Sequence, residues 1–211
     1  MNLLSLGTAQ RRLFAIHEPA APTPQTRAAV LCQPLGPEYT YAHRAMRQLA
    51  LRLTMAGYHT LRFDYYGTGD SAGPDTEVVT ADCERDVESA LEALADIAGV
   101  SRLTMIGLRM GANIAADVAV RRRGDIEKLV LWDPIVCDGL SALAGALPHP
   151  TGVFITDGSE ALKGLMRGTT GSGASGVFVE SVPTQCPWVE SASISGALPV
   201  AVIQRILEWL Q

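Results

Sequence analysis

The sequence has few charged residues and no long apolar run, which narrows the classes of protein that it can encode. Charged residues make up 18% of the 211 positions and hydrophobic residues 47%, a balance typical of a compact folded chain and not of a disordered one. The net charge of -5 and the single basic run, Arg121–Arg123, argue against a nucleic-acid partner, and we interpret that run as a solvated helix end. The apolar residues at the N-terminus are too few for a signal sequence or a membrane span, so we expect a cytoplasmic protein with no membrane partner.

The sequence also has no close pair of cysteines. Cys32, Cys83, Cys137 and Cys186 stand singly, which argues against a metal knuckle or a disulfide framework. We expect most of these thiols to be buried, and we expect neither a metal nor a cofactor. No repeat and no shift in composition marks a second unit, so we expect one domain over residues 1–211.

What is present is an alternation of strand-like and helix-like segments. The apolar patterns predict strands within residues 11–16, 27–36, 57–65, 101–107, 126–133, 152–156 and 176–181. Helical spacing predicts helices over residues 41–56, 80–98, 160–166 and 199–210, and a further one that begins after Arg109. Strands that alternate with helices favour an α/β fold, a three-layer sandwich with a mainly parallel sheet.

In such a sheet, ligands bind beyond the carboxyl ends of the strands. We therefore expect the loops near Leu35, Tyr65, Arg109, Asp133 and Asp157 to share one rim, together with the loop after Glu180. The stretch TMIGLRMGANIAA, residues 104–116, predicts a strand, a sharp turn and a helix. Its small residues suit a strained turn where strand and helix approach closely, and Arg109 stands at its centre.

Four segments together resemble the α/β-hydrolase superfamily, nearest to its serine aminopeptidase-like members. They are AVLCQPLGPE, GYHTLRFDYYGTGDSAG, IGLRMGANIAA and LVLWDPIV, they occur in the family's order, and the resemblance covers roughly residues 11–211. It implies a nucleophile elbow after the fifth strand, an acid after a later strand and a histidine just before the final helix. It also implies a cap after the sixth strand, for which residues 133–152 leave little room, so we expect most of the cap to be missing.

Two members of the implied catalytic machinery are missing. Arg109 stands at the nucleophile position of a degenerate Gly-Leu-Arg-Met-Gly elbow, and a guanidinium stays protonated and has no acceptor, so it serves neither as nucleophile nor as general base. The stretch before the final helix, residues 182–199, contains no histidine. His17, His43 and His59 fall in predicted elements or in the N-terminal third, which leaves His149 as the one histidine that could reach the rim as a base.

Arg109 allows two interpretations. In one, it forms a salt bridge with Asp133 or Asp157 that plugs the former site, the second of these standing where the family's acid often lies. In the other, the elbow lifts Arg109 into an open cleft, where it holds a carboxylate or phosphate of a ligand with help from the adjacent helix N-terminus.

The resemblance supplies the remaining candidates. An oxyanion hole would use the amides of Leu35, Gly36 and Met110, because the neighbouring Pro34 and Pro37 donate nothing. Tyr65 ends a strand at the expected rim. Short hydrolase-like proteins that accompany exopolysaccharide or secondary-metabolite genes share the Gly-Leu-Arg elbow and a tryptophan near the C-terminal part of the site, here Trp188.

Three functions follow as hypotheses. The first is a non-hydrolytic binding or auxiliary protein of a biosynthetic pathway, which holds a small anionic or acyl ligand, or a protein partner or second copy at the uncapped rim. The second is a repurposed lyase, isomerase or cyclase that uses Arg109, Asp133, Asp157 or Tyr65. The third is a residual esterase or thioesterase with a displaced nucleophile, Ser71 or Cys137. The glycine-rich loop YYGTGDSAG is interpreted as a turn, because no helix opens directly from it and no lysine follows.

Overall fold

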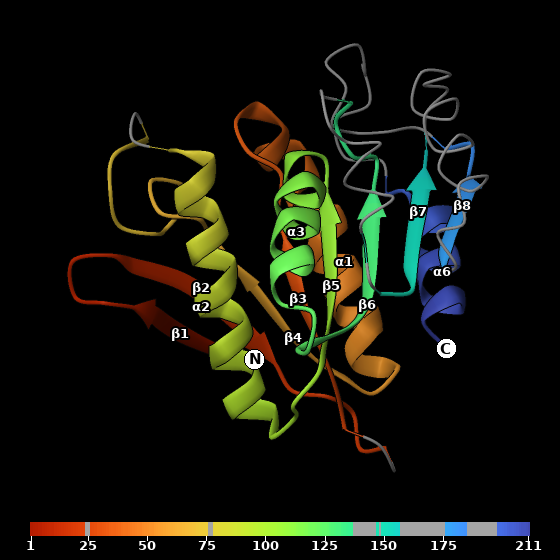
Figure 1. The fold of residues 1–211 in the computed structure, drawn as a ribbon, viewed down its shortest axis with the longest axis horizontal. Coiled ribbons are helices and arrows are strands. Elements are labelled where there is room, and N and C mark those ends of the chain that lie inside the picture. The colour runs from red at the N-terminus through yellow and green to blue at the C-terminus, as the bar shows by residue number, and fades with distance from the viewer. Residues whose placement is uncertain (24–25, 76–77, 137–146, 148, 157–175, 185–197) are drawn as a thin grey trace.

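A computed structural model describes residues 1–23, 26–75, 78–136, 147, 149–156, 176–184 and 198–211. Figure 1 shows a twisted sheet with helices on both faces. The strands are β1 (Asn2–Gly7), β2 (Arg12–Glu18), β3 (Arg27–Cys32), β4 (Tyr58–Phe63), β5 (Leu103–Leu108), β6 (Ile126–Trp132), β7 (Thr151–Ile155) and β8 (Val177–Ser181). The helices are α1 (Pro37–Met55), α2 (Thr80–Ala98), α3 (Met110–Arg121) and α6 (Val200–Leu210).

The described strands form one eight-stranded sheet in the order β1-β2-β4-β3-β5-β6-β7-β8. The first two pairings, β1 with β2 and β2 with β4, are antiparallel, and every pairing from β4 to β8 is parallel. The predicted three-layer α/β sandwich is thus confirmed. Strand β1 was not predicted. Its apolar pattern is short, and among its residues only Leu6 is buried.

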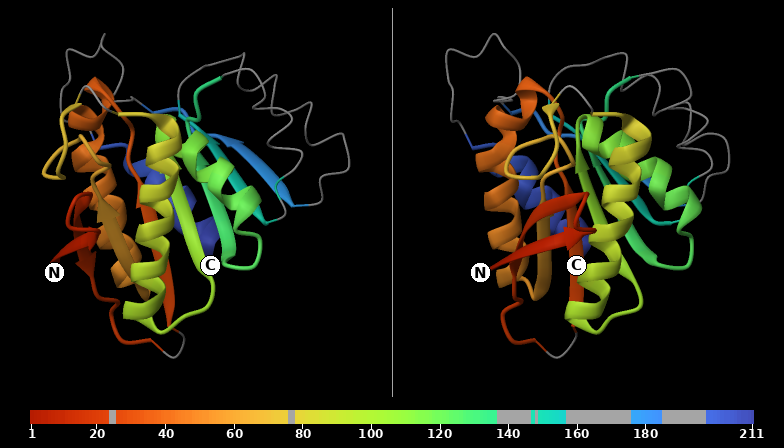
Figure 2. Two further views of the ribbon diagram at one scale, coloured as in Figure 1. Left: turned by 60° about the vertical axis from the view of Figure 1, so that its left-hand side comes forward. Right: turned by 90° about the vertical axis from the view of Figure 1, so that its left-hand side faces the viewer.

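The two faces of the sheet carry separate apolar cores. Side chains of α2 and α3 pack with one face, including Leu91, Leu94, Ile114 and Val118, while α1 and α6 cover the other face with residues such as Leu49, Leu53, Ile203 and Ile206. Figure 2 shows the helix pairs on opposite sides of the sheet. Burying an aliphatic side chain of this size contributes about 2 kcal/mol, so these two layers fix the strands whose carboxyl ends form the rim.

Helix α1 begins at Pro37 and not at Tyr41 as predicted. Gly36 is its N-cap residue with φ of 65°, a conformation that glycine adopts without steric cost. Proline at the first helical position and an acidic residue in the first turn are both favourable there, which explains the earlier start. The consequence is that Glu38, in the predicted oxyanion loop, belongs to the first turn of a helix at the rim.

Other expectations are confirmed in part or lie outside the described residues. Cys32 and Cys83 are free and buried, as expected, while Cys137 and Cys186 fall outside the described part of the chain. The helix expected over residues 160–166 also lies outside it. Within the described residues, no helix is both long and apolar enough to cross a bilayer.

Candidate functional site

The turn between β5 and α3 is a strained elbow with Arg109 at its centre. Arg109 has φ of 56° and ψ of -124°, a conformation that residues with side chains rarely adopt. Its amide donates to the carbonyl of Trp132 (3.0 Å), and its own carbonyl accepts from the amide of Ala112 (2.9 Å). The strand, turn and helix predicted from residues 104–116 are therefore present, and Arg109 lies between them at the carboxyl end of β5.

Glycines make this elbow possible because backbones meet here without room for side chains. A Cβ placed on Gly107 would lie 2.6 Å from the amide nitrogen of Ala112 and still closer to the carbonyl of Gly111. A Cβ placed on Gly111 would lie 2.8 Å from the carbonyl carbon of Cys32. These contacts seat α3 directly against the end of β3, so the elbow and the loop that follows β3 are neighbours.

Among the described residues, the guanidinium of Arg109 forms an ion pair with Glu38, a residue that the sequence analysis does not name. Its Nε lies 2.9 Å from Oε1 of Glu38, in the first turn of α1, and its Nη1 donates to the backbone carbonyl of Asp133 (3.2 Å). Both side chains of the ion pair are about one quarter exposed, 27% for Arg109 and 25% for Glu38. The pair thus spans the elbow and α1 and remains accessible from solvent.

Asp133 contributes its backbone, and not its carboxylate, to Arg109. The carboxylate accepts hydrogen bonds from the amide of Thr156 (2.7 Å) and from the Thr156 hydroxyl. Asp133 has φ of 43° and is 5% exposed. This aspartate ties the end of β6 to the residue after β7, so its carboxylate does not form the salt bridge to Arg109 that was one of the two expected. The other, from Asp157, lies outside the described residues.

Glu38 is the site residue that the sequence analysis missed. Its place in the first turn of α1 could have been found from Pro37, because proline followed by an acidic residue is a helix-start signal. In a parallel sheet the helix after β3 begins at the same rim as the elbow after β5. Pro37 is thus a helix start as well as a residue without an amide donor.

Leu35, Gly36 and Met110 lie at this rim, as predicted. The Leu35 and Met110 side chains are half-buried and pack against the core on the α2 and α3 face. Gly36 is exposed, and its carbonyl accepts from the amide of Tyr39 (3.1 Å). Within the described residues, the amides of Leu35, Gly36 and Met110 have no hydrogen-bond acceptor, which keeps three donors for an anion next to the elbow.

Tyr65 does not reach the rim. It is 1% exposed, and its ring packs edge-to-face on Phe63 with 5.0 Å between centroids. Burial raises the pKa of its hydroxyl well above the usual value. The expectation of a ligand contact through Tyr65 is therefore corrected: alternation along β4 turns this residue toward the α2 face of the sheet.

The neighbouring Asp64 takes the rim position and organises the loop. Its carboxylate accepts from the hydroxyl of Tyr39 (2.8 Å), the side-chain amide of Gln33 (3.2 Å) and the backbone amide of Asp70 (3.0 Å). Burial, followed by the charge of Asp64, raises the pKa of Tyr39. These bonds connect the ends of β3 and β4 to α1, so they hold the first turn that carries Glu38.

In the glycine-rich loop after β4, hydroxyl and amide donors form hydrogen bonds to the protein's own backbone. Ser71 donates its hydroxyl to the carbonyl of Asp64 (2.6 Å) and accepts from the amide of Phe14 (2.8 Å). The amide of Gly67 donates to the carbonyl of Ala72 (2.8 Å). These bonds are those of a turn and leave Ser71 in a structural role.

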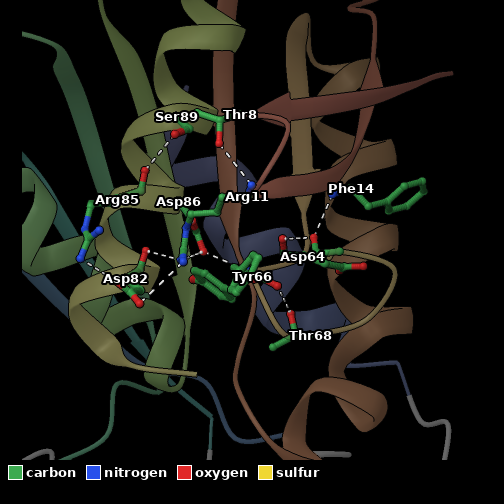
Figure 3. Close-up of polar contacts among 12 residues, drawn as sticks. Thr8, Arg11, Phe14, Asp64, Tyr66, Thr68, Asp82, Arg85, Asp86 and Ser89 are labelled. Carbon is green, nitrogen blue, oxygen red and sulfur yellow. Dashed lines mark hydrogen bonds and ion pairs between the residues drawn. The ribbon is translucent and has the colours of Figure 1, made fainter. Parts of the chain in front are cut away.

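Asp86 of α2 holds the start of the same loop and also binds Arg11. The carboxylate of Asp86 accepts from the Tyr66 amide (2.9 Å) and from Nε and Nη2 of Arg11 (2.9 and 3.0 Å). Figure 3 shows Arg11 reaching from the β1–β2 connection across α2 to Asp82 and Asp86, beside the ring of Tyr66.

No described histidine stands in the loops that follow β3, β4, β5 and β6. His149 precedes β7, at the opposite end from the rim, and its Nε2 lies 3.1 Å from the carbonyl of Ala119. His17 and His59 contact each other, with 3.1 Å between Nε2 and Nδ1, and His43 is exposed on α1. The possibility that His149 reaches the rim as a base is therefore excluded. Asp157, Trp188 and Cys137 lie outside the described residues.

Comparisons with known proteins identify the family and the fold. A family model, serine aminopeptidase S33, matches residues 39–151. Candidate carbamate hydrolases named RutD from Klebsiella pneumoniae and Klebsiella variicola are each 32% identical over 114 residues, which is 53% of this chain. The matched segment spans only 39% of the length of these relatives.

Solved structures with the same fold include three bacterial proteins. A candidate α/β hydrolase of unknown function from Agrobacterium tumefaciens superposes with a TM-score of 0.80 at 19% identity, covering 99% of this chain and 94% of its own. A serine hydrolase without a lid from Xanthomonas campestris gives 0.77 at 15% (99% and 93%). Est1E of Butyrivibrio proteoclasticus with bound ferulic acid gives 0.78 at 14% (98% and 97%). Likeness at these identities concerns the fold alone.

Proposed function

We propose a binding role for this chain, which belongs to the serine aminopeptidase S33 family of the α/β-hydrolase superfamily. In this proposal it is a non-hydrolytic binding or auxiliary protein of a biosynthetic pathway in the cytoplasm. It holds a small anionic or acyl ligand, or a protein partner, at the rim around the elbow. One observation carries the proposal: the elbow residue is Arg109, and its side chain is paired with Glu38 and the carbonyl of Asp133.

The chemistry of arginine supports a role in binding. Its guanidinium offers five N–H donors and no lone pair, so it holds an anion well but does not attack a carbonyl or take up a proton at physiological pH. Hydrolysis by the family's usual route also needs a base beside the nucleophile. No described histidine stands in the loops that follow β3, β4, β5 and β6, and Ser71 uses its hydroxyl in two backbone hydrogen bonds.

A non-hydrolytic enzyme on an acyl or anionic substrate is the second candidate. The amides of Leu35 and Met110 favour it, because they point to an oxyanion site that persists beside an elbow without a nucleophile. Arg109 would then anchor the substrate. Hydrolysis, the activity in the name of the RutD relatives, ranks below both because it requires a nucleophile outside the elbow.

A serine-directed fluorophosphonate probe tests the proposal. The full chain is incubated with the probe beside an active serine esterase, and adducts are measured by intact mass. We expect no adduct on this chain under conditions that label the esterase completely. A stoichiometric adduct on any residue would reveal an activated nucleophile and overturn the binding role.

A further inference from the structure

We propose that Glu38 is a built-in competitor for the binding site of Arg109, so that the site takes the carboxylate of a small organic acid in place of the Glu38 carboxylate. This inference rests on the proposed binding function and names its ligand class. Oε1 of Glu38 lies 2.9 Å from Nε of Arg109. A ligand carboxylate has the same charge and the same acceptor geometry.

The guanidinium has donors to spare for such a ligand. Arg109 donates from Nε to Glu38 and from Nη1 to the carbonyl of Asp133. The other N–H groups of its guanidinium have no partner among the described residues. An arginine binds a carboxylate best through two parallel N–H bonds. Rotation of the Glu38 side chain frees the Nε edge for that arrangement.

The exchange requires only side-chain movement. Glu38 is fixed by its backbone in the first turn of α1, after Gly36 and Pro37, and its side chain is 25% exposed. Ion pairs that water reaches contribute little to stability and are readily exchanged. The carbonyl of Asp133 keeps its contact with Nη1 during the exchange, so the guanidinium stays in place.

The charge at the rim favours a carboxylate over a phosphate. Among the described residues, the loops and the first helical turn that follow β3, β4, β5 and β6 carry one guanidinium, that of Arg109, and carboxylates at Glu38, Asp64, Asp70, Asp75 and Asp133. A ligand adds its own charge while the Glu38 carboxylate stays nearby, so a dianion meets about twice the repulsion that a monoanion meets.

Apolar groups beside the pair predict the body of the ligand. The half-buried side chains of Leu35 and Met110 follow β3 and β5, and Val136, after β6, is 47% exposed. The backbone before Val136 is held by Asn113, whose side-chain amide exchanges two 2.9 Å hydrogen bonds with Ile135. An aliphatic or aryl acid thus places its carboxylate on Arg109 and its carbon chain on these side chains.

Calorimetric titration of the full chain with octanoate tests the proposal. Octanol and inorganic phosphate serve as comparison probes, and the proteins are wild type, Glu38→Gln, Arg109→Gln and the double variant. Glu92→Gln is the matched control. Glu92 also pairs with an arginine, Arg122 at 3.2 Å, but it lies at an exposed position of α2. Thermal melting verifies that each variant is folded.

We expect Glu38→Gln to bind octanoate at least tenfold more tightly than wild type, and Glu92→Gln to match wild type. Arg109→Gln and the double variant should lose octanoate binding, and octanol and phosphate should not bind. Equal octanoate affinity in wild type and Glu38→Gln, or no binding by a folded Glu38→Gln, would overturn the competitor role. Retention of binding in the double variant would do the same.

Turnover of 4-nitrophenyl octanoate by the same proteins separates the two proposals. If none of them hydrolyses the ester and Glu38→Gln fails to bind octanoate, the inference fails while the binding function stands. If wild type hydrolyses the ester and Arg109→Gln does not, the binding function itself fails. Tight binding by Glu38→Gln without turnover supports both.

Discussion

Two arginine–carboxylate pairs of this molecule have the same Nε–O distance and opposite surroundings. Arg11 and Asp86 join the β1–β2 connection to α2, and Arg109 and Glu38 join the elbow to α1, each at 2.9 Å. Asp86 is 2% exposed and also accepts from Nη2 of Arg11 and from the Tyr66 amide, while Arg11 lies 4.3 Å from the centre of the Tyr66 ring. Glu38 is 25% exposed and holds Arg109 through Nε.

The difference teaches that the distance within an ion pair does not reveal its role. If a buried carboxylate that accepts from three donors moved away, it would leave an unpaired charge and an unpaired amide. Such a pair therefore stabilises the fold. A carboxylate at the surface with one donor can be replaced by another carboxylate. The first pair is structural, and the second, on a strained backbone, is suited to exchange with a ligand.

The largest expected effect comes from breaking the buried pair. Asp86→Ala removes the acceptor of Arg11 and of the Tyr66 amide at a side chain that is 2% exposed and whose pKa burial raises. We expect the free energy of unfolding in urea to fall by roughly 3 kcal/mol. A loss below about 1 kcal/mol would place the two pairs in the same class.

The pH dependence of stability tests a third polar contact, that of His17 with His59, which belongs to neither ion pair. Burial, with a smaller effect of His59, lowers the pKa of His17. Because the folded state then binds the proton less well than the unfolded state, stability is complete above about pH 6.5 and falls as the pH decreases below it. The slope should not exceed about 1.4 kcal/mol per pH unit, the limit for one proton.

Urea unfolding at several pH values measures this slope. His17→Gln should flatten it, whereas His43→Gln, at an exposed position on α1, should leave it unchanged. An unchanged slope in His17→Gln would assign the acid sensitivity to another group.

A glycine at the elbow tests whether Arg109 is there for stability. Arg109→Gly loses a partly exposed ion pair but relieves a backbone with φ of 56°. We expect thermal unfolding to show a gain of about 1 kcal/mol, because strain at such a residue outweighs a surface ion pair. A loss of the size expected for Asp86→Ala would make Arg109 a structural residue.

The smallest expected effect belongs to the exchangeable carboxylate. Glu38→Gln keeps the side-chain shape and a carbonyl acceptor for Nε of Arg109, so the free energy of unfolding should change by less than about 0.5 kcal/mol. Urea unfolding beside Asp86→Ala gives this comparison in one experiment. A destabilisation above about 2 kcal/mol would show that Glu38 is fixed and not free to leave.

Local pattern predicted most of the fold. Helical spacing located α2 and α6, apolar runs located β3 to β8 among the described strands, and the small residues around Arg109 indicated the elbow. These features depend on periodicity and on close backbone approach, and residues near one another in the sequence determine both.

The partners within the site were harder to predict, because they depend on where side chains at strand ends and helix starts point. Glu38 was hidden by a helix start set too late, and Tyr65 was placed at the rim although strand alternation turns it into the core. Asp133 was assigned to Arg109 by its position, but its carboxylate goes to Thr156. Contacts of this kind join residues far apart in the chain and leave no local pattern.

The most direct test of the central claim is turnover of a panel of aryl esters and acyl thioesters by wild type beside Arg109→Ala, with products followed chromatographically so that non-hydrolytic conversion is also detected. The account predicts no product above the buffer control with either protein. Product formed by wild type and lost in Arg109→Ala would contradict it, because Arg109 would then serve a reaction and not only a bound ligand.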